Sequence, residues 1–294
     1  MRMRRLPTWV LIVAVLAAVG CKSKSEMDDL LAQSPFKTQP RLTPGGLVLV
    51  SLEYHPLQLP GGVDVTAWSA WTELEASLAA GPAAPAAGVL NPQQVQLWRE
   101  NGFYVVWAPR TAWPRLREQI VQAGGTAREQ TTVYFRNSAE VARLPALWND
   151  RAASCGVADG RGSLRVHTLE PSQAVFSLTC QPPPADPQSQ TAPIRFKIVP
   201  ELYRPQRQER LELDETGKAQ RWVEELKVSF ESLALSVALR PDEFLMIAAR
   251  PERTTAPTLG NLFLSRSQTA ENYQWVAVLT PAVITARQVT DKVP

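Results

Sequence analysis

Residues 233–249 read LALSVALRPDEFLMIAA, two apolar runs with four turn-forming or polar residues between them. The four residues, Arg240-Pro241-Asp242-Glu243, have the composition of a turn. Short apolar runs bounded by turn residues are typical of β-strands. The stretch therefore predicts two strands, at 233–239 and 244–249, joined by a turn.

The same strand pattern covers the C-terminal third of the chain. Residues 194–198 (IRFKI) and 226–231 (LKVSFE) alternate apolar with polar side chains, and 275–279 form a further apolar run. An alternation with a period of two is expected when one face of a strand is buried. We expect a mainly antiparallel β-domain over 194–287.

Helices and strands alternate in the N-terminal half. Apolar residues recur at helical spacing from Trp68 to Leu78. Asn91 and Pro92 are residue types preferred at the N-cap and first turn of a helix. The expected elements are a strand at 47–54, helices at 68–78 and 92–101, a strand at 103–108, a helix at 111–123, a strand at 131–136, a short helix at 138–144, and a hairpin of 163–169 with 174–180. This order predicts a small α/β module over 47–180.

A proline-rich segment, QPPPADPQSQTAP at 181–193, separates the two parts. Proline cannot donate to a β-ladder or continue a helix, so this segment is expected to be a linker. The predicted fold class is α+β, with a small N-terminal α/β module (47–180) followed by the mainly antiparallel β-domain (194–287).

The first 21 residues, MRMRRLPTWVLIVAVLAAVGC, have the pattern of an export signal. Arginines precede an apolar run from Trp9 to Val19, which is shorter than the roughly 20 residues that span a bilayer as a helix. Residues 1–20 are therefore expected to be a cleaved signal peptide. Residues 21–46, which are polar and rich in proline, are expected to be a flexible tether.

Ala18-Val19-Gly20-Cys21 resembles a bacterial lipobox, in which the cysteine sulfur accepts diacylglycerol and the new N-terminus takes a further acyl chain such as palmitate. Two or more chains anchor a protein firmly to a membrane. Cys21 is thus the predicted lipidation site. The residue after it is Lys22 and not an aspartate, which by family analogy favours an outer-membrane anchor facing the periplasm.

The net charge of +3 belongs to the leader. Arg2, Arg4 and Arg5 are removed with residues 1–20, which leaves 28 basic and 28 acidic side chains. A neutral chain gives no support for nucleic-acid binding. Only two histidines occur, His55 and His167, far apart in sequence, so a metal centre or a histidine-based triad is not expected. No motif indicates a catalytic residue or a cofactor site, and we do not expect an enzyme.

With Cys21 acylated, Cys155 and Cys180 remain as an even pair in an oxidising compartment. A disulfide between them would close a loop of about 25 residues and contribute about 3 kcal/mol. The alternative is two separate buried thiols, because free cysteine is commonly buried.

Four short motifs in order give the C-terminal part a family resemblance. They are IRFKIVP (194–200), LRPDEFLMIAA (239–249), TLGNLF (258–263) and WVAVLTPAVI (275–284). Residues 194–286 resemble the C-terminal β-domain of secretins, the channel family of type II and type III secretion. In these motifs Gly260 would permit a tight bend and Pro281 would end a strand.

The resemblance implies a lipid-anchored cell-envelope protein that assembles or interacts with a secretion or envelope complex. Docking on a channel by strand addition, or self-association, would be its mode of action. The alternative is a periplasmic module that binds glycan or peptide through exposed tryptophans, with Trp98, Trp107, Trp113 and Trp148 as candidates. Burial of these rings would remove the alternative.

The lipid anchor has a direct test. Because Cys21 is the predicted lipid acceptor, Cys21→Ala should move the protein from the membrane fraction of a bacterial host to the soluble fraction. Cys155→Ala, which leaves the lipobox intact, is the control and should stay with the membranes. Membrane attachment of Cys21→Ala would contradict the prediction.

Overall fold

The computed structural model describes residues 48–79, 90–136, 140–149, 152–182, 192–213, 219–251, 257–268 and 271–285. All of them belong to one compact unit of the chain, residues 35–294. The predicted signal peptide, the tether, Cys21 and most of the proline-rich linker lie outside the described residues.

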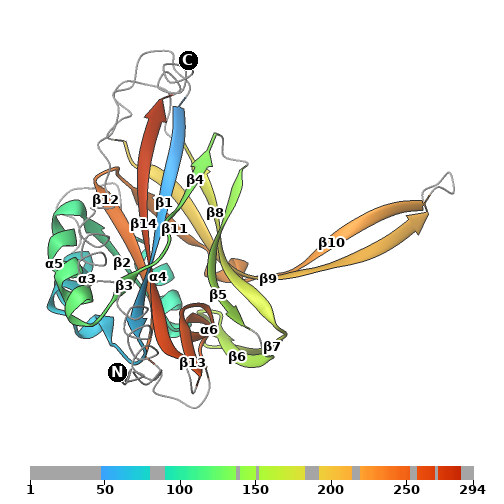
Figure 1. The fold of residues 1–294 in the computed structure, drawn as a ribbon, viewed down its shortest axis with the longest axis horizontal. Helices are drawn as coiled ribbons and strands as arrows, with labels where there is room; N and C mark the ends of the chain where they lie inside the picture. The colour runs from blue at the N-terminus through green and yellow to red at the C-terminus, as the bar shows by residue number, and fades with distance from the viewer. Residues whose placement is uncertain are drawn as a thin grey trace, which may run out of the picture. The chain divides into compact units, whose positions relative to one another are not determined.

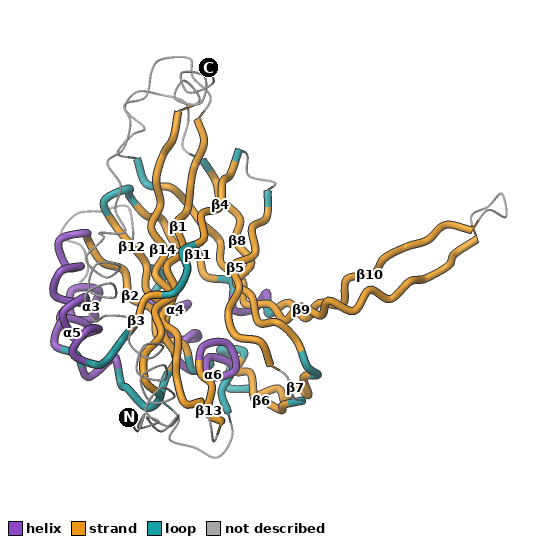
Figure 2. The backbone as a smooth tube through the Cα atoms, viewed as in Figure 1, coloured by secondary structure: helices purple, strands orange, loops and turns teal. Residues whose placement is uncertain are grey.

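The described chain is mainly antiparallel β-structure with a few helices, which confirms the α+β class (Figure 2). The strands are β1 (Val48–Pro60), β2 (Phe103–Pro109), β3 (Thr126–Ala127), β4 (Thr131–Phe135), β5 (Val141–Asn149), β6 (Ala153–Ala158), β7 (Leu164–Leu169), β8 (Ser172–Gln181), β9 (Ile194–Leu213), β10 (Ala219–Ser229), β11 (Leu235–Leu239), β12 (Glu243–Ala249), β13 (Ser265–Gln268) and β14 (Glu271–Thr285). The helices are α3 (Ser69–Ala79), α4 (Pro92–Glu100), α5 (Trp113–Gln122) and α6 (Leu259–Leu264), with 3-10 turns η1 (Val65–Ala67), η2 (Arg110–Ala112) and η4 (Glu231–Leu233).

The first sheet, sheet A, has the order β2-β12-β14-β1, with β3 and β4 also pairing with β1 and β13 with β14. Its longest ladder joins β1 to β14, from Val48 opposite Thr285 to Pro60 opposite Tyr273. The first and last described strands therefore lie side by side in the middle of this sheet (Figure 1).

The second sheet, sheet B, has the order β10-β9-β8-β5, with β11 also pairing with β9. Beyond Tyr203, β9 pairs only with β10 among the described strands, so the two continue as a two-stranded ribbon (Figure 1). Strands β6 and β7 form a separate two-stranded sheet.

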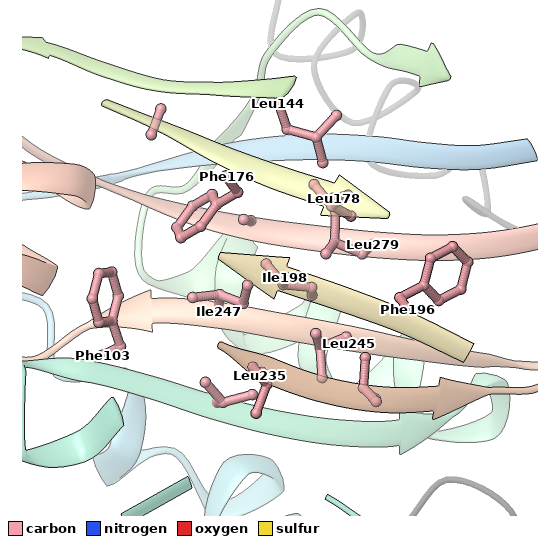
Figure 3. Close-up of a cluster of buried hydrophobic side chains, with 14 of the residues drawn as sticks. Phe103, Leu144, Phe176, Leu178, Phe196, Ile198, Leu235, Leu245, Ile247 and Leu279 are labelled. Carbon is pink, nitrogen blue, oxygen red and sulfur yellow. The ribbon is translucent and has the colours of Figure 1, made fainter. Parts of the chain in front are cut away.

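The main core lies between sheets A and B. Phe103, Leu245 and Ile247 of sheet A point toward Phe176 and Ile198 of sheet B (Figure 3). The opposite face of sheet A packs on helices, as in the edge-to-face contact of Trp113 in α5 with Phe244 at 5.7 Å. Every residue of β12 is buried because both faces of this strand are covered.

The stretch at 233–249 connects the two sheets. Both predicted strands and the turn are present, but β11 pairs with β9 in sheet B, whereas β12 pairs with β2 and β14 in sheet A. The turn is closed by the Glu243 N–H, which donates to the Arg240 carbonyl at 3.0 Å, and by the Arg240 N–H, which donates to the Glu243 carboxylate at 2.7 Å. Burial raises the pKa of this carboxyl group.

Several local predictions were wrong. Of the helix expected at 138–144, residues 141–144 are the start of β5, where pairing with β8 overrides the helical pattern. The strands expected at 163–169 and 174–180 exist, but they do not form a hairpin, because β7 pairs with β6 and β8 lies between β5 and β9. Pro281 does not end a strand, because β14 continues to Thr285. It faces Leu52 on β1, beyond the last pair of β14 with β12.

The predicted division at 181–193 does not separate two sheets. In sheet A, β12 and β14 of the predicted β-domain lie between β2 and β1 of the predicted α/β module, and strands of both parts also share sheet B. The predicted module over 47–180 and the predicted domain over 194–287 therefore share both sheets. Long-range pairing such as that of β1 with β14 leaves no signal in local sequence patterns.

Gly260 lies within helix α6 and not in a bend. A Cβ atom on this residue would lie 2.0 Å from the Gly102 carbonyl oxygen, and the Gly260 N–H donates to the Asn101 carbonyl at 2.9 Å. The glycine is required by the close approach of α6 to the backbone that links α4 and β2.

This contact predicts an unusual response to alanine. Alanine favours a helix by about 1 kcal/mol over glycine, yet Gly260→Ala should lower the free energy of unfolding by about 3 kcal/mol, because a rigid backbone oxygen occupies the space. Gly62→Ala is the control, because no atom lies within 4 Å of its added Cβ. Its left-handed φ of 82° should cost about 1 kcal/mol. Urea unfolding measures both, and wild-type stability of Gly260→Ala would contradict the packing.

Candidate functional site: the open edge of β7

The closest acid–imidazole pair of the described residues lies on β1. His55 Nε2 is 3.5 Å from the Glu53 carboxylate, and the side chains are only 17 and 6 % exposed. Thr280, opposite Glu53 on β14, is also buried. The burial of these groups keeps substrate away from them, so the pair has a structural role in sheet A.

Two general features bear on the type of site. Within the described ranges, no group of three or more His, Cys, Asp or Glu side chains lies close enough to hold a metal ion. None of the helices formed by the described residues is long and apolar enough to cross a membrane.

Several hollows are lined by the described residues, including one of about 190 Å³ between Thr168 at the end of β7 and Leu202 and Val228 of β9 and β10. Two others also adjoin ion pairs. One of about 270 Å³ lies between α3, α4 and β2, with Leu90, Val95 and Val105 in its wall and the Arg99–Glu75 ion pair (2.9 Å) beside them. The other, about 580 Å³, lies along β8, β9 and β11. Its lining includes Arg195 and Lys197, and Lys197 pairs with Glu231 at 2.9 Å. Neither lining places a nucleophile beside a base.

Strand edges are the remaining candidates, because an unpaired edge is a template for another chain. The edge of sheet B formed by β11 is covered by α4. The Trp98 indole N–H donates to the Leu233 carbonyl at 2.5 Å, and Gln94 accepts from the Ser236 N–H at 3.2 Å. Helix α4 therefore closes this margin of sheet B.

The opposite margin, formed by β4 of sheet A and β5 of sheet B, is protected against strand pairing in a different way. Pro145 has no N–H to offer at the edge of β5, and the pairing of β5 with β8 is interrupted by a bulge between Pro145 and Trp148. Tyr134 and Val141 are exposed here, at 57 and 56 %. A bulge and a proline are devices by which natural edge strands avoid pairing.

Strand β6 is anchored to the rest of the unit along its outer edge. The buried Asn101 side chain accepts from the Ala158 N–H at 2.9 Å and donates to the Ala158 carbonyl at 3.1 Å. Gly156 forms a parallel bridge with Thr258. The backbone groups of Gly156 and Ala158 that face away from β7 thus have partners.

Strand β7 has no such partner on its outer edge. The Asp159 N–H donates to the Ser163 carbonyl at 3.2 Å, which fixes Arg165 and His167 as the residues whose backbone groups point toward β6. The N–H and C=O groups of Leu164, Val166 and Thr168 therefore point outward, and no described residue bonds to them.

The exposed face of β7 is apolar. Leu164 and Val166 are 67 and 72 % exposed, the highest values among the large apolar side chains of the described residues. On the other face, the His167 ring contacts Phe230 edge-on at 5.5 Å. Strand β7 thus combines open backbone groups with two neighbouring apolar side chains.

Opposite charges flank β7. The turn before it carries Arg161, and Asp159 accepts the Arg161 and Ser163 N–H groups, which lowers the pKa of the Asp159 carboxyl. After the strand, Glu170 forms an ion pair with Arg204. The turn before the strand therefore holds Arg161 near the Asp159 carboxylate, and the strand is followed by the Glu170–Arg204 ion pair.

The predicted disulfide does not form. Cys155 in β6 and Cys180 in β8 are free, buried thiols. Burial raises the pKa of Cys155 to about 11 and that of Cys180 to about 12. Of the two alternatives drawn from the sequence, two separate buried thiols agrees with the structure.

The candidate tryptophans do not form an exposed array. Trp98 is fully buried and Trp113 is 7 % exposed, while Trp107 is partly buried against the main core. The side chain of Trp148 lies outside the described residues. The alternative of a glycan- or peptide-binding module therefore lacks the exposed tryptophans that it requires.

Sequence reasoning missed the edge of β7. The alternation of Leu164, Val166 and Thr168 was visible, but the expected hairpin with 174–180 would have paired that strand. The signal that was available is the Asp159–Gly162 turn, which joins β6 to β7 and leaves one side of β7 without a neighbour.

The thiols give a test of this packing. Because the reactive species is the thiolate and both pKa values are raised, Cys155 and Cys180 should resist alkylation at pH 8 in the folded protein. In the Cys21→Ala variant, mass spectrometry should detect no label without denaturant and two labels in guanidinium chloride. Two unlabelled cysteines in denaturant that react only after reduction would instead indicate a disulfide.

Comparison with known proteins gives limited information. No family model matches the sequence, and no curated protein matches it. Among solved structures, the chain is similar to the type IV competence pilus secretin PilQ of V. cholerae, with 10 % sequence identity and a TM-score of 0.19. The match covers 81 % of this chain and 59 % of that chain. At this identity and TM-score the similarity carries no argument about fold or function.

Proposed function

We propose that this chain is a lipid-anchored protein of the cell envelope that binds a protein partner by strand addition at the outer edge of β7. The observation that carries the proposal is the edge itself: three outward backbone positions, Leu164, Val166 and Thr168, without partners in the described residues, beside two strongly exposed apolar side chains.

The energetics of an added strand support this function. Each backbone hydrogen bond contributes about 0.5–1.5 kcal/mol net. Full burial of a leucine or valine side chain contributes about 1.5–3 kcal/mol. A strand laid along β7 makes both kinds of contact at once, whereas the margins protected by α4 and by Pro145 offer fewer of them.

The envelope location rests on the N-terminal sequence. The apolar run to Val19 and the lipobox-like Ala18–Cys21 precede a polar tether of about 25 residues. A tether of this composition lets the folded unit reach partners near the membrane surface.

The class of partner rests on the resemblance of residues 194–286 to the secretin β-domain. The partner that we propose is therefore a component of a secretion or envelope complex, either another protein of that complex or a second copy of this chain, reached from the membrane through the lipid on Cys21.

Strand addition can be tested by site-specific photo-crosslinking in a bacterial host. A photoreactive residue at Val166 of the full-length chain should give a discrete adduct that mass spectrometry can assign. The same probe at Val141, a valine of similar exposure on the protected β5 edge, is the matched control and should give little adduct.

A backbone variant separates strand addition from simple apolar contact. Thr168→Pro removes an outward N–H but no hydrogen bond between β6 and β7, so it should reduce the Val166 adduct at least about tenfold, as expected from the loss of one to two hydrogen bonds. Thr168→Ala keeps the N–H and should retain the adduct. Equal adducts at Val166 and Val141, unaffected by Thr168→Pro, would refute the proposed function.

A further inference from the structure

We infer that the strand that docks on β7 is β7 of a second copy of this chain, in an antiparallel two-fold pair centred on Val166. The inference rests on the proposed function, in which β7 is the docking strand, and names its partner.

The outward backbone groups of β7 are arranged symmetrically. Leu164, Val166 and Thr168 point outward at equal intervals, so a second β7 running the other way presents the same set of donors and acceptors. With Val166 opposite Val166 of the second copy, Leu164 lies opposite Thr168 of that copy. Each of these opposed pairs exchanges two N–H···O=C bonds, as in any hydrogen-bonded antiparallel pair.

The apolar face is continued by the same register. Val166 meets its own copy across the axis, and Leu164 is a diagonal neighbour of Val166 of the second copy, a distance that long side chains can bridge. The two most exposed large apolar side chains of the described chain are thereby partly covered from water in both copies.

Charge selects this register over its neighbour. With Val166 at the centre, Arg165 faces His167 of the second copy. A shift that places Leu164 opposite Val166 would bring Arg165 directly opposite Arg165, and like charges directly opposite are destabilising.

The ends of the strands also allow a charged contact between the copies. Antiparallel pairing brings the start of one β7 next to the end of the other. Arg161, in the turn before β7, then lies beside Glu170 of the second copy, where it would share that carboxylate with Arg204 of the second copy. A two-fold pair repeats this contact at both ends.

The size of the contact indicates a weak, reversible pair. Strand β7 has six residues, and interfaces built on so short a segment fall at the low end of specific interfaces. Anchoring through Cys21 would hold the copies on one surface and raise their effective concentration.

Cysteine substitution at the axis tests the inference. In an antiparallel hydrogen-bonded pair the opposed Cα atoms are about 5.5 Å apart, within the range of a disulfide. Val166→Cys in the full-length, membrane-anchored chain should give a disulfide-linked dimer on mild oxidation, at least about tenfold more than Val141→Cys, whose valine is similarly exposed. Adding Thr168→Pro to Val166→Cys should abolish the excess, and adding Thr168→Ala should not.

The outcomes separate the two proposals. A Val166→Cys dimer no stronger than that of Val141→Cys overturns the two-fold pair. If the photoreactive Val166 then gives an adduct with a different protein that Thr168→Pro removes, β7 still docks a strand and the proposed function stands. A strong Arg165→Cys dimer in place of the Val166→Cys dimer overturns the register centred on Val166.

Discussion

The ladder between β1 and β14 is the interaction on which the rest of the fold depends. It joins Val48–Pro60 to Glu271–Thr285 over the whole length of β1. Strands β3 and β4 pair onto β1, and β12 and β13 pair onto β14, so sheet A is assembled around this ladder. Because its two strands lie at opposite ends of the described chain, the sheet closes only when nearly the whole chain is present. This long-range closure is the reason that the two predicted parts cannot be separate domains.

The covering of the exposed strand edges follows from the same arrangement. Once the sheets are stacked, their margins are exposed, and α4 covers one of them through Trp98 and Gln94. Pro145 and a bulge protect part of the other. Asn101, at the end of α4, also bonds to the outer edge of β6. The outer edge of β7 has no such partner among the described residues. A small number of polar side chains thus closes some of the strand edges of this protein to another strand.

Much of the secondary structure was accessible from local patterns. Asn91 caps α4 by accepting the Gln93 N–H at 2.9 Å, as its position before Pro92 predicted. The helix predicted at 138–144 was wrong because residues 141–144 pair with β8, and strand pairing outweighs local helical spacing. Gly260 was assigned a bend, whereas the contact with Gly102 from a distant segment requires the glycine. These failures share one cause, a tertiary neighbour that no local window contains.

The sequence by itself determined the fold class: strands from alternation, and helices from spacing and caps. The export signal and the lipid-accepting Cys21 remain predictions from charge and hydropathy, because they lie outside the described residues. These are properties of residues close together in the chain. Only the tertiary structure decided that β11 and β12 belong to different sheets, that Cys155 and Cys180 are free, and that β7 has an open edge. Strand partners are chosen by contacts between distant residues, and the physical reason is that a β-strand satisfies its backbone groups outside its own segment.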